Sequence, residues 1–161
     1  MAPADLRKTM EATAREFLDS YRVSAVQNDP SLVNRSVTPD CKRHLLPQSM
    51  LKAVGIPLDY AFDNDTYEAE FKKDLALGAV GAHDVANVVI DVEARKLAAT
   101  TRVQMHYKVG SKETLTLEFS WFFDFNEDGT KITNVVEFTD SNAVQKMVEV
   151  ATAAKKEKEA E

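Results

Sequence analysis

The sequence has very little cysteine: Cys41 is the only one in 161 residues. A single cysteine cannot form an intrachain disulfide, and we interpret Cys41 as a small buried hydrophobic residue. The 5 glycines are not clustered, and the motifs that cradle phosphates or build a hydrolase nucleophile are missing. Basic residues are also scarce, because 20 lysines and arginines face 26 aspartates and glutamates, for a net charge of −6. A nucleic-acid binder, which normally has a basic face, is therefore not expected.

Long hydrophobic runs are missing too. No apolar run approaches the roughly 18 residues that would indicate a membrane span. The first residues lack the apolar segment of a secretory signal. We therefore expect a cytoplasmic protein without a membrane partner. The 3 histidines are not spaced as metal ligands, so we expect no metal site and no cofactor.

The length predicts a single domain, since one domain usually takes about 100–200 residues. We place this domain at residues 1–154. The charged tail of residues 155–161 is expected to fray.

Helical periodicity dominates the first half of the chain, where apolar residues recur at steps of three and four. Helices are predicted at residues 4–27, from Pro30 to Val37, as a turn at 49–54, and from Asn64 or Asp65, as the N-cap, to Leu77. A turn at residues 38–40 and a short strand at 41–46 lie between them. Gly78 and Gly81 are expected to end the last of these helices.

From His83 the period changes to two, which indicates strands. Four are predicted, at residues 85–92, 97–109, 115–125 and 131–139, and a final helix follows Ser141 and Asn142. Helices followed by consecutive antiparallel strands indicate an α+β fold with helices on one side of a curved sheet. Such a sheet leaves an apolar pocket on its concave face, the usual place for a ligand.

The alternation in the last two strands leaves two interpretations open. Closing the hairpin at Asp128 and Gly129 with an even loop predicts one very apolar face and one mixed face. The apolar face would carry Leu115, Leu117, Phe119, Trp121, Phe123, Ile132, Asn134, Val136 and Phe138. The mixed face would carry Thr116, Glu118, Ser120, Phe122, Thr133, Val135, Glu137 and Thr139. The alternation alone favours the first interpretation, in which the apolar face is the core under the helices and Glu118 and Glu137 are solvated.

In the second interpretation the mixed face lines the pocket. Glu137 then becomes a buried carboxylate whose pKa rises by desolvation. Glu118 and Phe122 line the same pocket, and an even loop at residues 110–113 adds Met105 and Tyr107. An odd loop there reverses the placement of these two residues.

The segment from Trp121 to Asn142 (WFFDFNEDGTKITNVVEFTDSN) resembles small fungal proteins of the SnoaL-like, NTF2-like superfamily. Upstream segments at residues 38–47, 64–67 and 89–96 resemble that group in the same order. The resemblance covers most of residues 10–150. It implies a cone-shaped α+β barrel, often a homodimer through the outer sheet face.

Members of this fungal group include cofactor-free cyclases and isomerases of natural-product pathways. They act on meroterpenoids, polyketides and prenylated indole alkaloids, the last by a semipinacol-type rearrangement. By this resemblance a polar residue of the first strand and the glutamate of the EF-x-D segment face the pocket. These positions are Arg43 and Glu137. Many relatives have histidine where Arg43 stands, whereas here His44 follows it.

These residues define the candidate site. Arg43 would polarise a carbonyl or hydroxyl, and Glu137 would shuttle a proton. The alternative for this pair is a structural ion pair between strands. Tyr60, Tyr67 and Tyr107 could hydrogen-bond a ligand or could belong to the core. Asp140 could cap the final helix or act in the site.

The sequence thus predicts a cofactor-independent isomerase or cyclase that acts on a bulky hydrophobic intermediate of fungal secondary metabolism. A dehydratase would require a clear histidine–aspartate pair. The alternative outside enzymes is a non-catalytic NTF2-like module for ligand binding or dimerisation.

Overall fold

The computed structural model describes residues 1–110 and 112–159, apart from the side chain of Lys158. Four α-helices, one 3₁₀ helix and six strands follow in this order over these residues: α1 (Pro3–Gln27), η1 (Pro30–Asn34), β1 (Val37–Leu46), α2 (Gln48–Ala53), α3 (Asn64–Leu77), β2 (Gly78–Val80), β3 (Asp84–Asp91), β4 (Lys96–Tyr107), β5 (Thr114–Phe125), β6 (Ile132–Thr139) and α4 (Ser141–Glu159). None of the helices described is long and apolar enough to cross a membrane.

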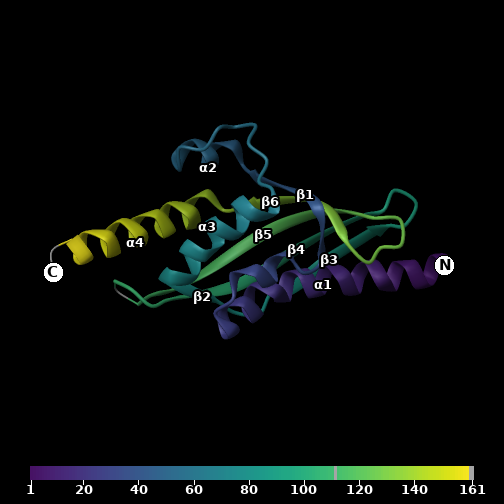
Figure 1. The fold of residues 1–161 in the computed structure, drawn as a ribbon, viewed down its shortest axis with the longest axis horizontal. Coiled ribbons are helices and arrows are strands. Elements are labelled where there is room, and N and C mark those ends of the chain that lie inside the picture. The colour runs from purple at the N-terminus through teal and green to yellow at the C-terminus, as the bar shows by residue number, and fades with distance from the viewer. Residues whose placement is uncertain (111, 160–161) are drawn as a thin grey trace.

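The strands form one sheet in the order β1-β6-β5-β4-β2, and β3 also pairs with β4. β1 runs parallel to β6, and every other pairing is antiparallel. Helices α1 and α3 lie along one face of this curved sheet (Figure 1). The α+β architecture with helices on one face of the sheet is therefore confirmed.

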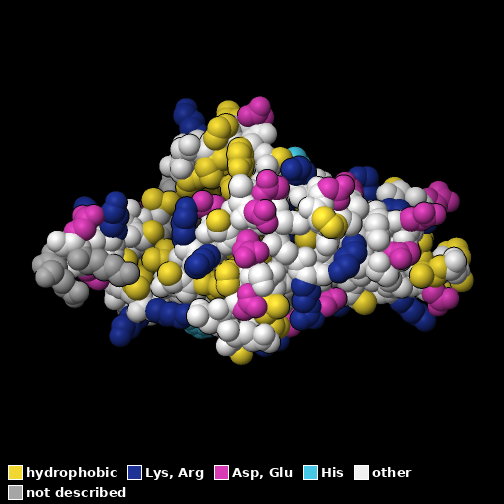
Figure 2. All heavy atoms as spheres, in the orientation of Figure 1, with side chains coloured by type: hydrophobic (Ala, Val, Ile, Leu, Met, Phe, Trp, Pro, Cys, Tyr) yellow, Lys and Arg dark blue, Asp and Glu magenta, His cyan; other side chains and the backbone are white. Residues whose placement is uncertain are grey.

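Helices α2 and α4 close one end of the helix-covered face. α2 projects at the top of the view in Figure 1, and α4 runs toward the C-terminus. Hydrophobic side chains gather over α2 and between α2 and α4 (Figure 2). α4 buries Val150 against Val103, Met105 and Leu117 of β4 and β5. The chain therefore brings its last helix back over the sheet.

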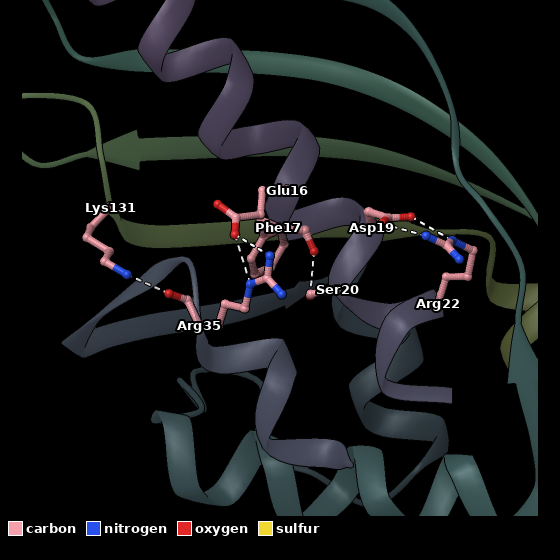
Figure 3. Close-up of polar contacts among 7 residues, drawn as sticks. All are labelled: Glu16, Phe17, Asp19, Ser20, Arg22, Arg35 and Lys131. Carbon is pink, nitrogen blue, oxygen red and sulfur yellow. Dashed lines mark hydrogen bonds and ion pairs between the residues drawn. The ribbon is translucent and has the colours of Figure 1, made fainter. Parts of the chain in front are cut away.

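Helix α1 supplies the main core. Met10 and Phe17 are fully buried and belong to the same cluster as Trp121, Phe123 and Ile132 of the sheet. On the outer side of α1, Glu16 pairs with Arg35, Asp19 pairs with Arg22, and Lys131 donates to the carbonyl of Arg35 (Figure 3). The contacts of Arg35 with Glu16 and Lys131 tie the end of η1 and the residue before β6 to α1.

The register of β5 and β6 differs from the prediction. Near the turn Phe125 pairs with Ile132, but further along Trp121 pairs with Glu137, because the register shifts between Asp124 and Phe125. A bulge adds one residue to one strand and reverses which face its later residues occupy. Val135, Glu137 and Thr139 therefore share the helix-covered face with Leu117, Trp121 and Phe123. Neither predicted set of faces was right in full.

Local boundaries were also partly wrong. Residues 38–40 belong to β1 rather than to a turn. The cap of α3 is Asp63, whose side chain accepts from the backbone N–H of Thr66. Gly78 begins the short strand β2, which the sequence analysis missed.

The tail differs as well. Helix α4 continues to Glu159, and the last two residues of the predicted frayed tail lie outside the described residues. A single domain at residues 1–154 stays a prediction.

Candidate functional site

A cavity of about 280 Å³ lies between the concave sheet face and the helices. Strands β4, β5 and β6 form its floor, and α3, α2 and α4 form its walls. Its lining includes Tyr21, Met50, Tyr67, Glu70, Phe71, Asp74, His83, Met105, Leu117, Phe119, Trp121, Glu137, Thr139, Val144, Met147, Val148 and Ala151. Most of these side chains are apolar or aromatic, so the few polar groups determine its chemistry.

Glu137 lies on the floor of this cavity. The bulge between Asp124 and Phe125 turns its side chain inward beside Trp121. Burial raises the pKa of Glu137 to about 7, and the charge of Asp74 adds to the rise. The hydrogen bond from Tyr67 and the charge of Arg43 act in the opposite direction. A carboxyl group with this pKa can both accept and donate a proton near neutral pH.

Two phenols form a chain that ends on Glu137. The hydroxyl of Tyr67 donates to Glu137 Oε2 at 3.4 Å, and the hydroxyl of Tyr21 lies 2.8 Å from that of Tyr67. Because Tyr67 gives its proton to the carboxylate, Tyr21 is the donor to Tyr67. Desolvation raises the pKa of both phenols, so they stay protonated. No described residue hydrogen-bonds the other carboxylate oxygen of Glu137, which leaves it free for a ligand.

Arg43 lies behind this chain and does not line the cavity. It is 1% exposed and donates to the carbonyl of Val33 and to the side-chain oxygens of Asn34 and Asn64. Its guanidinium carbon lies 4.3 Å from the ring centre of Tyr67, a cation–π contact. The prediction that Arg43 polarises a substrate carbonyl by direct contact is therefore wrong, because Arg43 is not among the described residues that line the cavity. Arg43 can act on the site only through Tyr67 and its charge.

Some of the other predicted site residues line the cavity, and others do not. Tyr67 and Met105 line the cavity. Met105 pairs with Leu115 and so shares the face of Leu117, which is the arrangement of the odd loop and not that of the even loop. Glu118 and Phe122 do not, because both are exposed on the outer face of β5. Tyr107 is buried in the cluster beneath α4, and its hydroxyl has no hydrogen-bond partner among the described residues. Neither Tyr60 nor Tyr107 is among the described residues that line the cavity.

Asp140 acts as a cap. Its carboxylate accepts from the backbone N–H of Asn142 at 2.9 Å, where α4 begins. Asp140 is not among the described residues that line the cavity, and the capping alternative is confirmed. His44 bonds to Asn134, and His44 is not part of the described cavity lining.

The sequence analysis missed four polar residues of the cavity lining: Glu70, Asp74, His83 and Tyr21. Asp74 follows Tyr67 and Phe71 at helical spacing, so the apolar side of α3 could have indicated it. His83 contacts Thr101 Oγ1, which also accepts from Trp121 Nε1, and burial lowers the pKa of His83 to about 4. Tyr21 stands in the middle of an apolar helix face. Its sequence position carries no sign of the long-range contact with Tyr67.

The described residues contain no group of three histidine, cysteine, aspartate or glutamate side chains that could hold a metal ion. The polar groups of the cavity are instead carboxyl, phenol, imidazole and hydroxyl groups. Proton transfer and hydrogen bonding are the chemistry that such a set provides.

This arrangement of helices over a curved, mostly antiparallel sheet is the SnoaL-like, NTF2-like fold. No protein-family model matches the chain, and a search of curated protein sequences also finds no match. The fold is established by comparison with solved structures.

Three solved structures of fungal proteins illustrate the likeness. BvnE pinacolase from Penicillium brevicompactum has a TM-score of 0.75 at 22% identity, over 96% of this chain and 98% of that one. AusH from Aspergillus nidulans has a TM-score of 0.67 at 23% identity, over 84% and 86%. PrhC from Penicillium brasilianum has a TM-score of 0.72 at 16% identity, over 94% and 92%. At these identities the likeness establishes the fold.

Proposed function

We propose that the protein is a cofactor-independent isomerase or cyclase that acts on a bulky apolar natural-product intermediate. The observation that carries the proposal is Glu137, a carboxyl group with a raised pKa on the floor of an otherwise apolar cavity. The likeness to a pinacolase supports this class of reaction. The location in the cytoplasm stays a prediction.

Glu137 would move the proton. In a semipinacol-type rearrangement a carbon substituent migrates with its bonding electrons to a neighbouring electron-poor carbon. The carbinol oxygen becomes a carbonyl, and its proton would pass to the free oxygen of Glu137. The electron-poor carbon breaks one bond to a heteroatom of the same molecule, which keeps that electron pair and would take the proton back from Glu137, so the product is an isomer of the substrate. In a cyclisation the same carboxyl group would donate or accept the proton that accompanies ring closure.

The remaining lining would supply shape and exclude water. Tyr67 would hold the carboxylate in place, and Arg43 would position Tyr67 through the cation–π contact. The apolar side chains of α2 and α4 would cover the bound intermediate.

We also propose a homodimer through the outer face of the sheet. Phe122 and Phe138 are 50% and 45% exposed there, and Val89 is 66% exposed. Cross-strand pairing brings Val89 next to Ala98, and Ala98 next to Phe122. A continuous exposed apolar patch of this kind is typical of an interface.

The test compares metabolites of a producing strain that carries the wild-type protein, no protein, or Glu137→Gln. We expect a product to be replaced by an isomer of equal mass in both altered strains, because the amide cannot exchange the proton. Glu118→Gln is the matched control, since Glu118 is exposed on the outer face. It should leave the profile unchanged.

Other outcomes identify the alternatives. A mass difference of one water would indicate a dehydratase. Unchanged metabolites with a folded Glu137→Gln protein would contradict the enzyme and favour the non-catalytic binding module. The apolar lining of the cavity is the observation in favour of that module. Circular dichroism of the purified variant verifies folding.

A further inference from the structure

The charged side chains of the cavity are all acidic. Glu70, Asp74 and Glu137 are carboxylates, and no lysine or arginine is among the described residues of the lining. The nearby cations are already engaged. Lys73 Nζ lies 2.6 Å from Glu70 Oε1, and the guanidinium group of Arg43 stacks over the ring of Tyr67. An anionic ligand would find no cation in this cavity, and like charges in a low-dielectric cavity repel strongly.

Asp74 is the carboxylate without a partner. Its carboxylate makes no hydrogen bond or ion pair with a described residue, and Asp74 lies seven residues after Tyr67 on α3. At 1.5 Å per residue this places Asp74 about 10 Å along the helix axis from Tyr67, the residue that contacts Glu137. A ligand that fills the cavity can therefore reach both carboxylates with different parts of its skeleton.

The surroundings of Asp74 make its charge costly in the empty cavity. Burial raises the pKa of Asp74 to about 7, Glu70 adds to the rise, and Lys73 opposes it. The charge of Asp74 in turn raises the pKa values of Glu137 on β6 and Tyr107 on β4. A bound cation would relieve these repulsions, because a buried charge is stable only when it is paired.

The aromatic lining suits a cation as well. Tyr21, Tyr67, Phe71, Phe119 and Trp121 surround the space, and aromatic faces attract ammonium groups. The lowered pKa of His83 keeps this imidazole neutral at neutral pH. No described group of the lining then carries a positive charge.

We propose that the cavity takes an apolar ligand that carries a protonated amine, with Asp74 as the counter-ion of that amine. The reacting part of the ligand lies at Glu137. This inference rests on the proposed function, since it names the substrate class of the same cavity.

The experiment measures binding of three indole probes of similar size by calorimetry at pH 8: tryptamine, tryptophol and indole-3-acetate. They carry a cation, a neutral hydroxyl and an anion on the same ring. We expect tryptamine to bind about tenfold more tightly than tryptophol, because a charge-assisted contact exceeds a neutral one. Indole-3-acetate should bind most weakly.

Two variants of α3 assign the effect. Asp74→Asn should abolish the preference for tryptamine over tryptophol and leave the affinity for tryptophol unchanged. Glu70→Gln is the comparison variant, because Glu70 is the lining carboxylate that pairs with Lys73. Removing the Glu70 charge takes away one cause of the raised pKa of Asp74, so Asp74 stays ionised at pH 8 and the preference should remain. In the wild-type protein the preference should fall when the pH is lowered from 8 to 5, as Asp74 and Glu137, whose pKa values are both about 7, become protonated. Asp74→Asn separates the two carboxyl groups, because Glu137 still titrates in that variant.

Two results would overturn the inference. One is a wild-type protein that does not bind tryptamine more tightly than tryptophol, including one that binds neither. The other is a preference that survives in folded Asp74→Asn protein.

Turnover of Glu137→Gln separates this failure from failure of the proposed function. If the wild-type protein shows no preference for tryptamine and Glu137→Gln has lost turnover, only the inference about the protonated amine is wrong. A preserved preference with normal turnover defeats the proposed chemistry.

Discussion

The behaviour of Glu137 depends on a balance between solvation and a single hydrogen bond. Burial is the largest cause of its raised pKa, and the bond from Tyr67 is the main opposing one. A hydrogen bond to the charged form stabilises the carboxylate and lowers its pKa. Tyr67 therefore determines how far the pKa of Glu137 rises.

Tyr67→Phe should raise the pKa of Glu137 further, because the carboxylate loses its described donor. If turnover requires the carboxylate form, activity falls on the acidic side of its pH profile. The acidic limb of kcat/KM against pH should then move to higher pH in the variant. The measurement is a pH profile with the substrate that the metabolite comparison identifies.

Tyr21→Phe is the control for this change. It removes the outer phenol and keeps the bond between Tyr67 and Glu137. Its profile should stay close to that of the wild-type protein. Equal profiles for Tyr67→Phe and the wild-type protein would contradict the role of Tyr67.

The hairpin between β5 and β6 orients Glu137 and is itself held by α1. Thr13 donates to the carbonyl of Gly129 at 2.8 Å, which joins α1 to the turn. Gly129 has a φ of 74°, and a Cβ there would lie 2.8 Å from Met10 Cγ and 3.0 Å from Leu6 Cδ1. The turn therefore packs closely against the helix only because residue 129 has no side chain.

Gly129→Ala should lower the free energy of unfolding by about 2–4 kcal/mol, from the left-handed backbone and the overlap with Met10. Gly55→Ala is a matched control, because Gly55 has the same φ of 74° and nothing within 4 Å of its Cβ position. Gly55→Ala should lower the free energy of unfolding by only about 1–2 kcal/mol, which is the cost of the left-handed backbone without any steric overlap. Urea unfolding of both variants measures the difference, and equal losses would show that the turn does not pack as described.

For the molecule as a whole, the two faces of the sheet have separate tasks. The concave face holds the cavity, and the outer face exposes the apolar patch around Phe122 and Phe138. Alternation along β5 produces this division, since Trp121 and Phe123 are buried and Phe122 between them is exposed. The proposed dimer would cover the outer face without blocking the cavity.

Phe138→Asp should convert the proposed dimer to a monomer, because a desolvated charge opposes association across an apolar interface. Val26→Asp is the control, since Val26 is exposed on α1, away from this face. Sedimentation of both variants against the wild-type protein measures the mass in solution. A wild-type protein that sediments as a monomer would contradict the interface.

Periodicity and turn chemistry were enough to predict most elements. The change from a helical period to a period of two located α1, α3 and the strands β3 to β6 within a few residues. These signals are local, because each arises from residues that are neighbours along the chain. The helix-over-sheet class followed from the order of the elements. The choice of Glu137 as the candidate proton carrier came from the resemblance of its segment.

The contents of the cavity depended on contacts between distant parts of the chain. A bulge between Asp124 and Phe125 turned Glu137 inward, and no pattern in β6 announces that extra residue. Arg43 is turned toward carbonyl and amide oxygens of η1 and α3 instead of the cavity. Asp74 and Tyr21 line the cavity because α3 and α1 pack over the concave face of the sheet, a long-range arrangement that neither helix sequence specifies. A side chain on a strand points to one face of the sheet or to the other. A shift of one residue in the pairing with the neighbouring strand moves every later side chain to the opposite face.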